Sequence, residues 1–379
     1  MNSMHNDLQP EKEAPAAINW PVALTLGLTF LAAITVVPVY GLFADFSAWA
    51  WVFCGMFLFL NVVGIGSGYH RLWSHRTYKA HPALALFLAI FGGMALQNSI
   101  LIWSARHRIH HRDVDDNAKD PYSIGRGFWF AHIGWMIRDY PSGNIDYSVV
   151  PDLQRDPIVM WQHRWYWTLV LVTNVGVPML LGWLVGDLWG VFLLAGVFRL
   201  VLNHHLTFFI NSLAHIWGSQ PYTDENSARD NWLIAMMTGG EGYHNYHHLF
   251  QNDYRNGVRW WNLDLNKWFI ASCSGLGLAH ELRRVPRFKI QRARLNMEFK
   301  RARQRIEQAA DSRPWREVLE SEYAEFLETV RKWQHLQVEK VHQSRVALAK
   351  RLDTRYRELE FSLKMQRKRL ALLTAQVSV

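Results

Sequence analysis

Four long apolar segments constrain the fold of this chain more than any other feature. Residues 20–43 contain no charged side chain, and a helix of that length can cross the hydrocarbon core of a bilayer. A second apolar run covers 48–68, and runs over 165–185 and 188–210 are separated only by Gly186-Asp187. Because backbone polar groups inside a bilayer must bond to each other, each run predicts a helix and each short turn a hairpin. We therefore expect an all-α integral membrane protein with four transmembrane helices in two hairpins.

The positive charges predict which side of the membrane holds the polar segments. The two hairpin turns contain no Lys or Arg, whereas the segment 71–164 contains eleven. Cytoplasmic loops carry such an excess, so we expect a multi-pass protein of a bacterial inner membrane with its polar cap and both termini in the cytoplasm. No signal peptide is predicted. A further apolar run at 82–102 lies between polar segments on that one side, so it predicts a helix lying in or dipping into the interface.

Histidine clusters dominate the polar cap. The stretch His107-Arg108-Ile109-His110-His111 places three imidazoles at i, i+3 and i+4, which share one face of a helix. The pattern returns at His244-Asn245-Tyr246-His247-His248, and His70 and His75 form a further pair. A single buried histidine is usually a packed and hydrogen-bonded residue, but three within five residues favour metal ligands.

The donor set limits the metal. An all-nitrogen site fits iron or zinc, and a closed structural zinc site would use only four ligands. Cys54 and Cys273 lie far apart in apolar surroundings, so neither a disulfide nor a thiolate site is expected. Carboxylates would orient the rings, and the candidates are Asp113, Asp116, Asp120, Asp224, Glu241 and Asp253. Asp120-Pro121 could equally form a plain turn.

These motifs together resemble the membrane fatty-acid desaturase family, and in detail its Δ9 acyl-CoA (stearoyl-CoA) desaturase branch. The resemblance covers about residues 20–285 and rests on the segments 68–78, 107–111 with Asp120-Pro121, 211–215 and 240–248. In that family nine histidines bind two irons, and the matching positions here are His70, His75, His107, His110, His111, His215, His244, His247 and His248. The resemblance further implies that Asn211 reaches a metal through water.

The same resemblance implies the substrate contacts. Gln97, Trp103 and Thr207 match positions that shape the bend of the acyl tunnel, and Asn98 and Arg138 match positions near the headgroup. From the residues alone, Trp103 could be a core residue and Thr207 could bond back to its own helix. The family's CoA contacts fall at Ala105, Arg106 and Asp139, where this chain differs, so acyl-lipid and acyl-carrier-protein substrates stay open beside acyl-CoA. His204 and His205 fall outside the family pattern and are interpreted as packing or headgroup contacts.

The implied activity is an O₂-dependent fatty acyl desaturase that inserts a cis double bond, at Δ9, with a di-iron centre. Removing hydrogen from an unactivated methylene needs a redox metal that activates O₂. The chain contains no G-x-G-x-x-G and no C-x-x-C-H motif, so two electrons are expected from an external carrier, a ferredoxin or a cytochrome b-type protein with its reductase. The alternatives are a related membrane di-iron hydroxylase and a metal-dependent membrane scaffold that presents the tail. No nucleic-acid partner is expected.

The last hundred residues differ in composition from the rest. Residues 281–379 carry a net charge of +11, and the remainder carries −2. The region 290–375 predicts long amphipathic helices with one break at Asp311-Ser312-Arg313-Pro314. We expect a self-packed helical hairpin or a coiled coil that self-associates, and its charge would attract anionic lipid or an acidic carrier. The predicted domains are a polar segment at 1–18, a membrane-embedded desaturase domain at 19–285 and a basic helical tail at 286–379.

Overall fold

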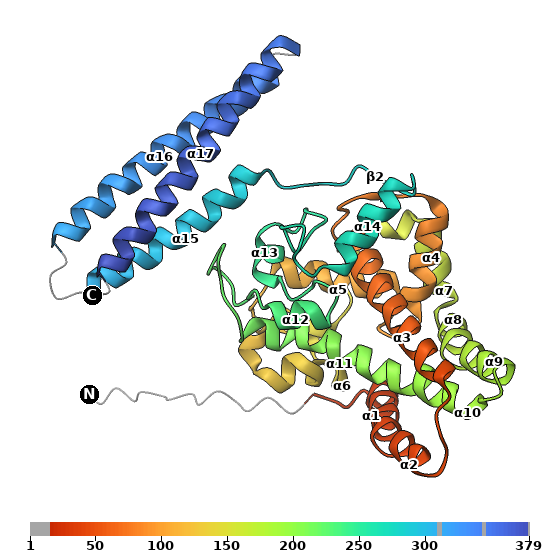
Figure 1. Cartoon of the computed structure of the whole chain (residues 1–379). Helices are drawn as coiled ribbons and strands as arrows, with labels where there is room; N and C mark the ends of the chain where they lie inside the picture. The colour runs from red at the N-terminus through yellow and green to blue at the C-terminus, as the bar shows by residue number, and fades with distance from the viewer. Residues whose placement is uncertain (1–15, 309–312, 343–345, 378–379) are drawn as a thin grey trace, which may run out of the picture. The chain divides into compact units, whose positions relative to one another are not determined.

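The computed structural model describes residues 16–308, 313–342 and 346–377 (Figure 1). Within them, the only paired strands are β1 (Lys79–Ala80) and β2 (Ala279–His280), which are antiparallel, and the other regular elements are helical. The predicted all-α fold is therefore confirmed. The chain divides into two compact units: Met1–Ser74 with Leu86–Ser212, and His75–Ala85 with Leu213–Val379.

Among the described residues, four helices are long and apolar enough to cross a membrane, as the sequence predicted. They cover Trp20–Phe43, Ala48–Ser74, Tyr166–Leu184 and Leu188–His215. Each is built from shorter pieces: α1 (Trp20–Ile34) and α2 (Val36–Phe43); α3 (Ala48–Val63) and a π-helix at Gly64–Ser74; α8 (Tyr166–Leu171), a π-helix at Val172–Gly176 and α9 (Val177–Leu184); α10 (Leu188–Val191), a π-helix at Phe192–Phe198 and α11 (Arg199–Asn211).

Side chains at the two hairpin turns hold the four helices in place. The Asp187 carboxylate accepts the Ser47 N–H at 2.9 Å and the Gly190 N–H at 2.9 Å, so one residue joins both turns. A buried cluster fills the space between the helices, with members that include Ala50, Phe57 and Leu194. Burying such apolar side chains against one another excludes lipid and aligns the helix ends that carry the polar residues.

The region 82–102 is not one continuous helix, and the sequence-based expectation is wrong there. Helix α4 (Pro82–Gly93) ends before a non-helical stretch, and α5 (Ile100–Arg112) begins after it. Leu96 and Asn98 adopt left-handed backbone conformations, with φ of 52° and 75°. Residues other than glycine rarely adopt this conformation. Distant residues stabilise the break: the Asn98 N–H donates to Tyr166 Oη at 2.9 Å, and the Ile100 N–H donates to Gln162 Oε1 at 3.1 Å.

Short helices complete the two units. The first contains α6 (Trp135–Ile137), α7 (Pro157–Arg164), a π-helix at Phe130–Gly134 and 3₁₀ turns at Ile124–Arg126, Pro141–Gly143, Tyr147–Val149 and Leu153–Arg155. The second contains a 3₁₀ turn at Leu213–His215, α12 (Trp232–Met237), α13 (His244–Leu249) and α14 (Leu265–Gly275).

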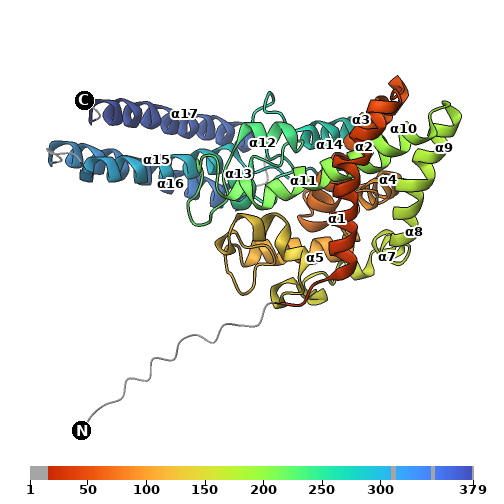
Figure 2. The same ribbon diagram turned by 90° about the horizontal axis from the view of Figure 1, so that it is seen from below.

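The tail contains three helices, which run side by side in Figures 1 and 2. They are α15 (Arg287–Gln308), α16 (Arg313–His342) and α17 (Val346–Val377). They share a buried core whose members include Phe299, Phe326 and Leu363. Helix α16 begins at Arg313, within the predicted break, whose Asp311 and Ser312 lie outside the described residues. Residues 343–345, between α16 and α17, also lie outside the described residues.

Candidate metal centre

The helices present the predicted histidines in two different ways. His107, His110 and His111 lie on the last turns of α5, and His244, His247 and His248 lie on the short helix α13. His70 lies in the π-helix at Gly64–Ser74, and His75 follows directly after it. The i→i+5 bonding of a π-helix brings residues five apart toward one face, so this spacing suits the pair His70 and His75.

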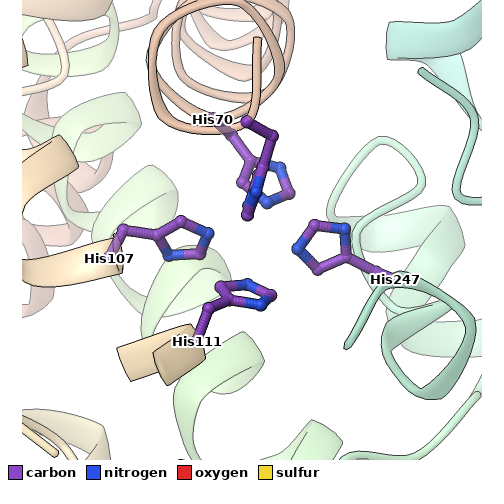
Figure 3. A group of neighbouring side chains, drawn as sticks. His70, His107, His111 and His247 are labelled. Carbon is purple, nitrogen blue, oxygen red and sulfur yellow. The ribbon is translucent and has the colours of Figure 1, made fainter. Parts of the chain in front are cut away.

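The nine histidines fall into two groups. The first contains His70, His75, His107, His111 and His247, and the second contains His110, His215, His244 and His248. Within each group the ligand nitrogens lie within 4.8 Å of one another. Figure 3 shows the rings of His70, His107, His111 and His247 turned toward a common centre.

Ring distances show how closely the histidines approach one another. In the first group, the His107 ring centroid lies 4.7 Å from that of His70 and 4.6 Å from that of His111. In the second, His244 Nε2 lies 3.1 Å from His215 Nε2 and 3.1 Å from His248 Nε2. Several nitrogens therefore converge on one point in each group, as metal coordination requires.

Neighbouring polar groups orient three of these rings. Both oxygens of Asp120 lie at 2.9 and 3.0 Å from His110 Nδ1, and both side chains are buried. Burial opposes ionisation of Asp120, but the His110 ring and two backbone N–H groups hold the pKa of the carboxyl below its ordinary value. Tyr122 Oη lies 3.3 Å from His107 Nδ1, and Ser227 Oγ lies 2.7 Å from His215 Nδ1. Such partners at Nδ1 leave Nε2 to bind a metal.

Four of the other candidate carboxylates pair with cationic side chains. Asp113 pairs with Arg112, Asp116 with Lys119, and Asp224 with Lys300. Asp253 binds Arg255 and Tyr246, and Glu241 accepts from Asn256 and Asn266. Lys and Arg neighbours bind Asp113, Asp116, Asp224 and Asp253, and the histidine motifs alone do not reveal these neighbours. Ser227 and Tyr122 were missed as ring partners, because a serine or tyrosine carries no sequence signal for that role.

The donor chemistry fits transition-metal ions. Most of the nine rings are buried, so the groups are shielded from water. Neither group includes a cysteine, and imidazole alone suits iron, zinc, copper or nickel. Ligand nitrogens spaced within 4.8 Å are compatible with metal–nitrogen bonds of about 2 Å.

The residues assigned to the bend of an acyl tunnel make specific contacts, and one of them contacts the first histidine group. Gln97 Nε2 donates to Thr207 Oγ1 at 2.9 Å, and Thr207 Oγ1 donates to the Asn203 carbonyl at 3.0 Å. The Trp103 ring stacks on His107 with centroids 4.7 Å apart. Thr207 thus bonds back to its own helix, as the sequence allowed, and it also accepts a hydrogen bond from Gln97.

Arg138, which was assigned near the headgroup, and the neighbouring Asp139 contact the start of the described chain. The Arg138 guanidinium donates to the Ala16 carbonyl at 2.7 Å, and Asn19 Nδ2 donates to Asp139 Oδ1 at 2.8 Å. Arg106 donates to the Gly143 carbonyl and lies over the Trp135 ring, while Ala105 is buried.

Three further polar residues near the fourth long helix have clear positions. Asn211 is the last residue of α11. His204 Nε2 lies 2.9 Å from the Ala95 carbonyl, and His205 Nδ1 lies 3.0 Å from His132 Nε2. His204 and His205 therefore make internal contacts outside both histidine groups.

Comparison with known proteins identifies the family. Residues 46–280 match the family model described as fatty acid desaturase. A "Probable acyl-CoA desaturase" of Schizosaccharomyces pombe is 44% identical over 73% of this chain and 57% of that protein. "Acyl-CoA desaturase 1" of Saccharomyces cerevisiae is 42% identical over 63% of this chain and 47% of that protein. "Stearoyl-CoA desaturase 5" of Bos taurus is 39% identical over 64% of this chain and 72% of that protein.

The matched region contains all nine histidines and ends before the tail. The chain spans about half the length of the two yeast relatives that it matches. The resemblance first inferred from the histidine motifs is confirmed: the chain belongs to the fatty acid desaturase family.

Proposed function

We propose that this protein is a membrane-bound, O₂-dependent fatty acyl desaturase that inserts a cis double bond at Δ9 of a saturated acyl-CoA. The observation that carries the proposal is the pair of converging histidine groups within the matched region. A scaffold would have no need of two such groups beside an apolar helical bundle.

Two iron ions are the proposed cofactors. One would be held by His70, His75, His107, His111 and His247, and the other by His110, His215, His244, His248 and, through water, Asn211. Bound iron supplies the O₂ activation that no side chain can supply. The overall reaction balances as one saturated C–C unit, O₂, two electrons and two protons giving one cis alkene and two waters.

The polypeptide itself would position the acyl chain. The bonded pair Gln97 and Thr207 would form the bend together with Trp103, which stacks on His107, so a chain bent there would present one carbon pair to the first group. Such positioning converts a reaction at an unactivated methylene into an oriented intramolecular step. The burial of the histidines would also exclude water, which limits side reactions.

The location and partners follow from the same reasoning. We infer that the four long helices cross the bilayer and that the histidine groups face the cytoplasm, where two electrons arrive from a ferredoxin or a cytochrome b-type protein. The three predicted parts, 1–18, 19–285 and 286–379, stay a proposal, as does self-association of the tail. The relatives reported above are eukaryotic and lend no support to a bacterial inner membrane.

The acyl carrier is the least constrained part of the proposal. Acyl-CoA is the substrate named for the relatives. At two positions that match CoA contacts of the family, Arg106 bonds the Gly143 carbonyl and Asp139 bonds Asn19. Because these side chains already have partners within the protein, acyl-lipid and acyl-carrier-protein substrates should be tested beside acyl-CoA.

Expression in a desaturase-deficient host tests the activity. Gas chromatography–mass spectrometry of derivatised fatty acids should show new Δ9 monoenes with the wild-type chain and none with His110→Ala or His247→Ala. Both variants should still accumulate in the membrane. Hydroxylated chains in place of monoenes would favour the hydroxylase. Monoenes made by either variant would contradict the di-iron assignment, and an iron-loaded protein that consumes no O₂ with acyl substrate and reductant would favour the scaffold.

A further inference from the structure

Helix α15 has two buried faces, although it lies beyond the region matched by the family model. One face contributes Phe288, Leu295 and Phe299 to the core of the tail. Ile290 and Met297 are also buried, at 6% and 7% exposed, yet they do not belong to that core. At 3.6 residues per turn they share a second face with Arg294 and Arg301, on the opposite side of the helix.

Three cations on α15 contact one short segment of the polar cap. Arg301 Nη2 donates to the Gln220 carbonyl at 2.6 Å, and Lys300 Nζ pairs with Asp224 Oδ2 at 2.6 Å. The Arg294 guanidinium lies 5.7 Å from the centroid of the Tyr222 ring. These contacts reach alternate residues, 220, 222 and 224, so α15 follows the segment along its length.

That segment continues directly to a predicted metal ligand. Ser227 Oγ lies 2.7 Å from His215 Nδ1. Gln220 Nε2 donates to the Asn226 carbonyl at 2.6 Å, which ties the start of the segment to the residue before Ser227. A displacement of Gln220 would therefore reach Ser227 and the His215 ring.

The segment 220–228 also binds the histidine motif at 244–248. Asn245, between His244 and Tyr246, accepts the N–H groups of Tyr222 and Thr223 and donates to the carbonyls of Thr223 and Ala228. The segment 220–228 is thus held from two sides, by α15 and by the motif that supplies His244 and His248.

We propose that α15 is a positioning element for the second histidine group: Arg294, Lys300 and Arg301 hold the segment 220–228, which orients His215. The tail then supports the metal site mechanically and does not act only as a basic surface. The predicted change in bound iron rests on the proposed function, in which the histidine groups bind iron.

The test compares two kinds of variant on one helix of the full-length protein in detergent. The test variant is Lys300→Ala with Arg301→Ala, and the matched control is Arg303→Ala. Arg303 is as exposed as Lys300, but it pairs with Glu320 inside the tail at 2.8 Å. Hydrogen exchange of peptides covering 216–229 reports the segment without depending on metal or activity, and mass spectrometry of bound iron reports the site.

We expect amide exchange in 216–229 to accelerate about ten-fold in the test variant, which corresponds to about 1.4 kcal/mol of lost local stability. Bound iron should fall from two toward one per chain. The control should match wild type, and Arg301→Lys should retain both properties because an ammonium can still donate to the Gln220 carbonyl. If the double variant does not accumulate, Lys300→Ala alone should show the same changes at smaller size.

Two results would overturn the inference. One is unchanged exchange in 216–229, and the other is faster exchange with wild-type iron content. A wild-type protein that binds no iron would instead refute the proposed function, while the exchange data would still judge whether α15 holds the segment.

Discussion

The Asp120–His110 contact gives the most exacting test of the candidate metal centre. Asp120 accepts from His110 Nδ1 with both oxygens and also accepts the N–H groups of Asp115 and Tyr122, at 3.1 Å each. Its side chain is fully buried. Replacing Asp120 with Asn keeps the shape but turns one acceptor oxygen into an NH₂ donor.

The geometry predicts what that replacement removes. The amide oxygen can still accept from His110 and from one backbone N–H, but the NH₂ group then faces the other N–H. One buried donor loses its partner, which costs about 1–3 kcal/mol. The His110 bond also changes from charge-assisted to neutral, and loss of such a partner lowers metal affinity about 10–100-fold. That range corresponds to about 1.4–2.7 kcal/mol of binding free energy.

Competition with a chelator measures the effect. Purified Asp120→Asn should release iron at a chelator concentration about 10–100-fold lower than wild type requires. Asp113→Asn is the matched control, because Asp113 pairs with the exposed Arg112 and lies near the same motif. Equal iron retention by Asp120→Asn and wild type would refute the role assigned to this carboxylate.

Three further predictions follow from single contacts. Thr207→Val removes the acceptor of the Gln97 bond, so the double-bond position should broaden in a product analysis by mass spectrometry; an unchanged single isomer would exclude Thr207 from the bend. Gly92→Val would overlap the Tyr69 ring and should cost about 1–3 kcal/mol, seen as a lower melting temperature than wild type in detergent. Burial raises the pKa of Asp230 to about 7, above its unfolded value. Stability should therefore fall as pH rises from about 4 to about 7, by up to about 4 kcal/mol, and Asp230→Asn should remove that slope in thermal melts.

The long helices were predictable because their signal is local. A run without charge such as 20–43 has few alternatives in a bilayer, and the turn at Gly186-Asp187 ends one helix and begins another without help from distant residues. The fold class therefore followed from the sequence alone.

The break at 94–99 was not predictable, because distant residues stabilise it. An apolar run from 82 favours one helix by periodicity, but Gln162 and Tyr166 accept the N–H groups that such a helix would have bonded internally. Those partners lie more than sixty positions away. The same limit applies to Ser227 at His215 and to Lys300, which pairs with Asp224.

The histidine motifs show where sequence reasoning was correct and where it stopped. Three imidazoles at i, i+3 and i+4 were expected to share one face of a helix, and the sequence did not assign them to individual sites. In α5, however, His107 and His111 join the first group and His110 joins the second. Residues i and i+4 lie about 40° apart around a helix, while i+3 lies about 100° from i+4. The motif can therefore direct two rings toward one group and the third ring toward the other.

Helix α13 repeats this division in the opposite sense. His244 and His248 join the second group, and His247 joins the first. Each H-x₂-H-H motif therefore gives a pair to one group and a single ring to the other. Neither group can form from one helix alone, and rotating either helix would disturb both. The spacing of three and four residues in both motifs thus supplies ligands to two adjacent groups, as the proposed pair of ions would require, whereas a single ion would need only the i, i+4 pair.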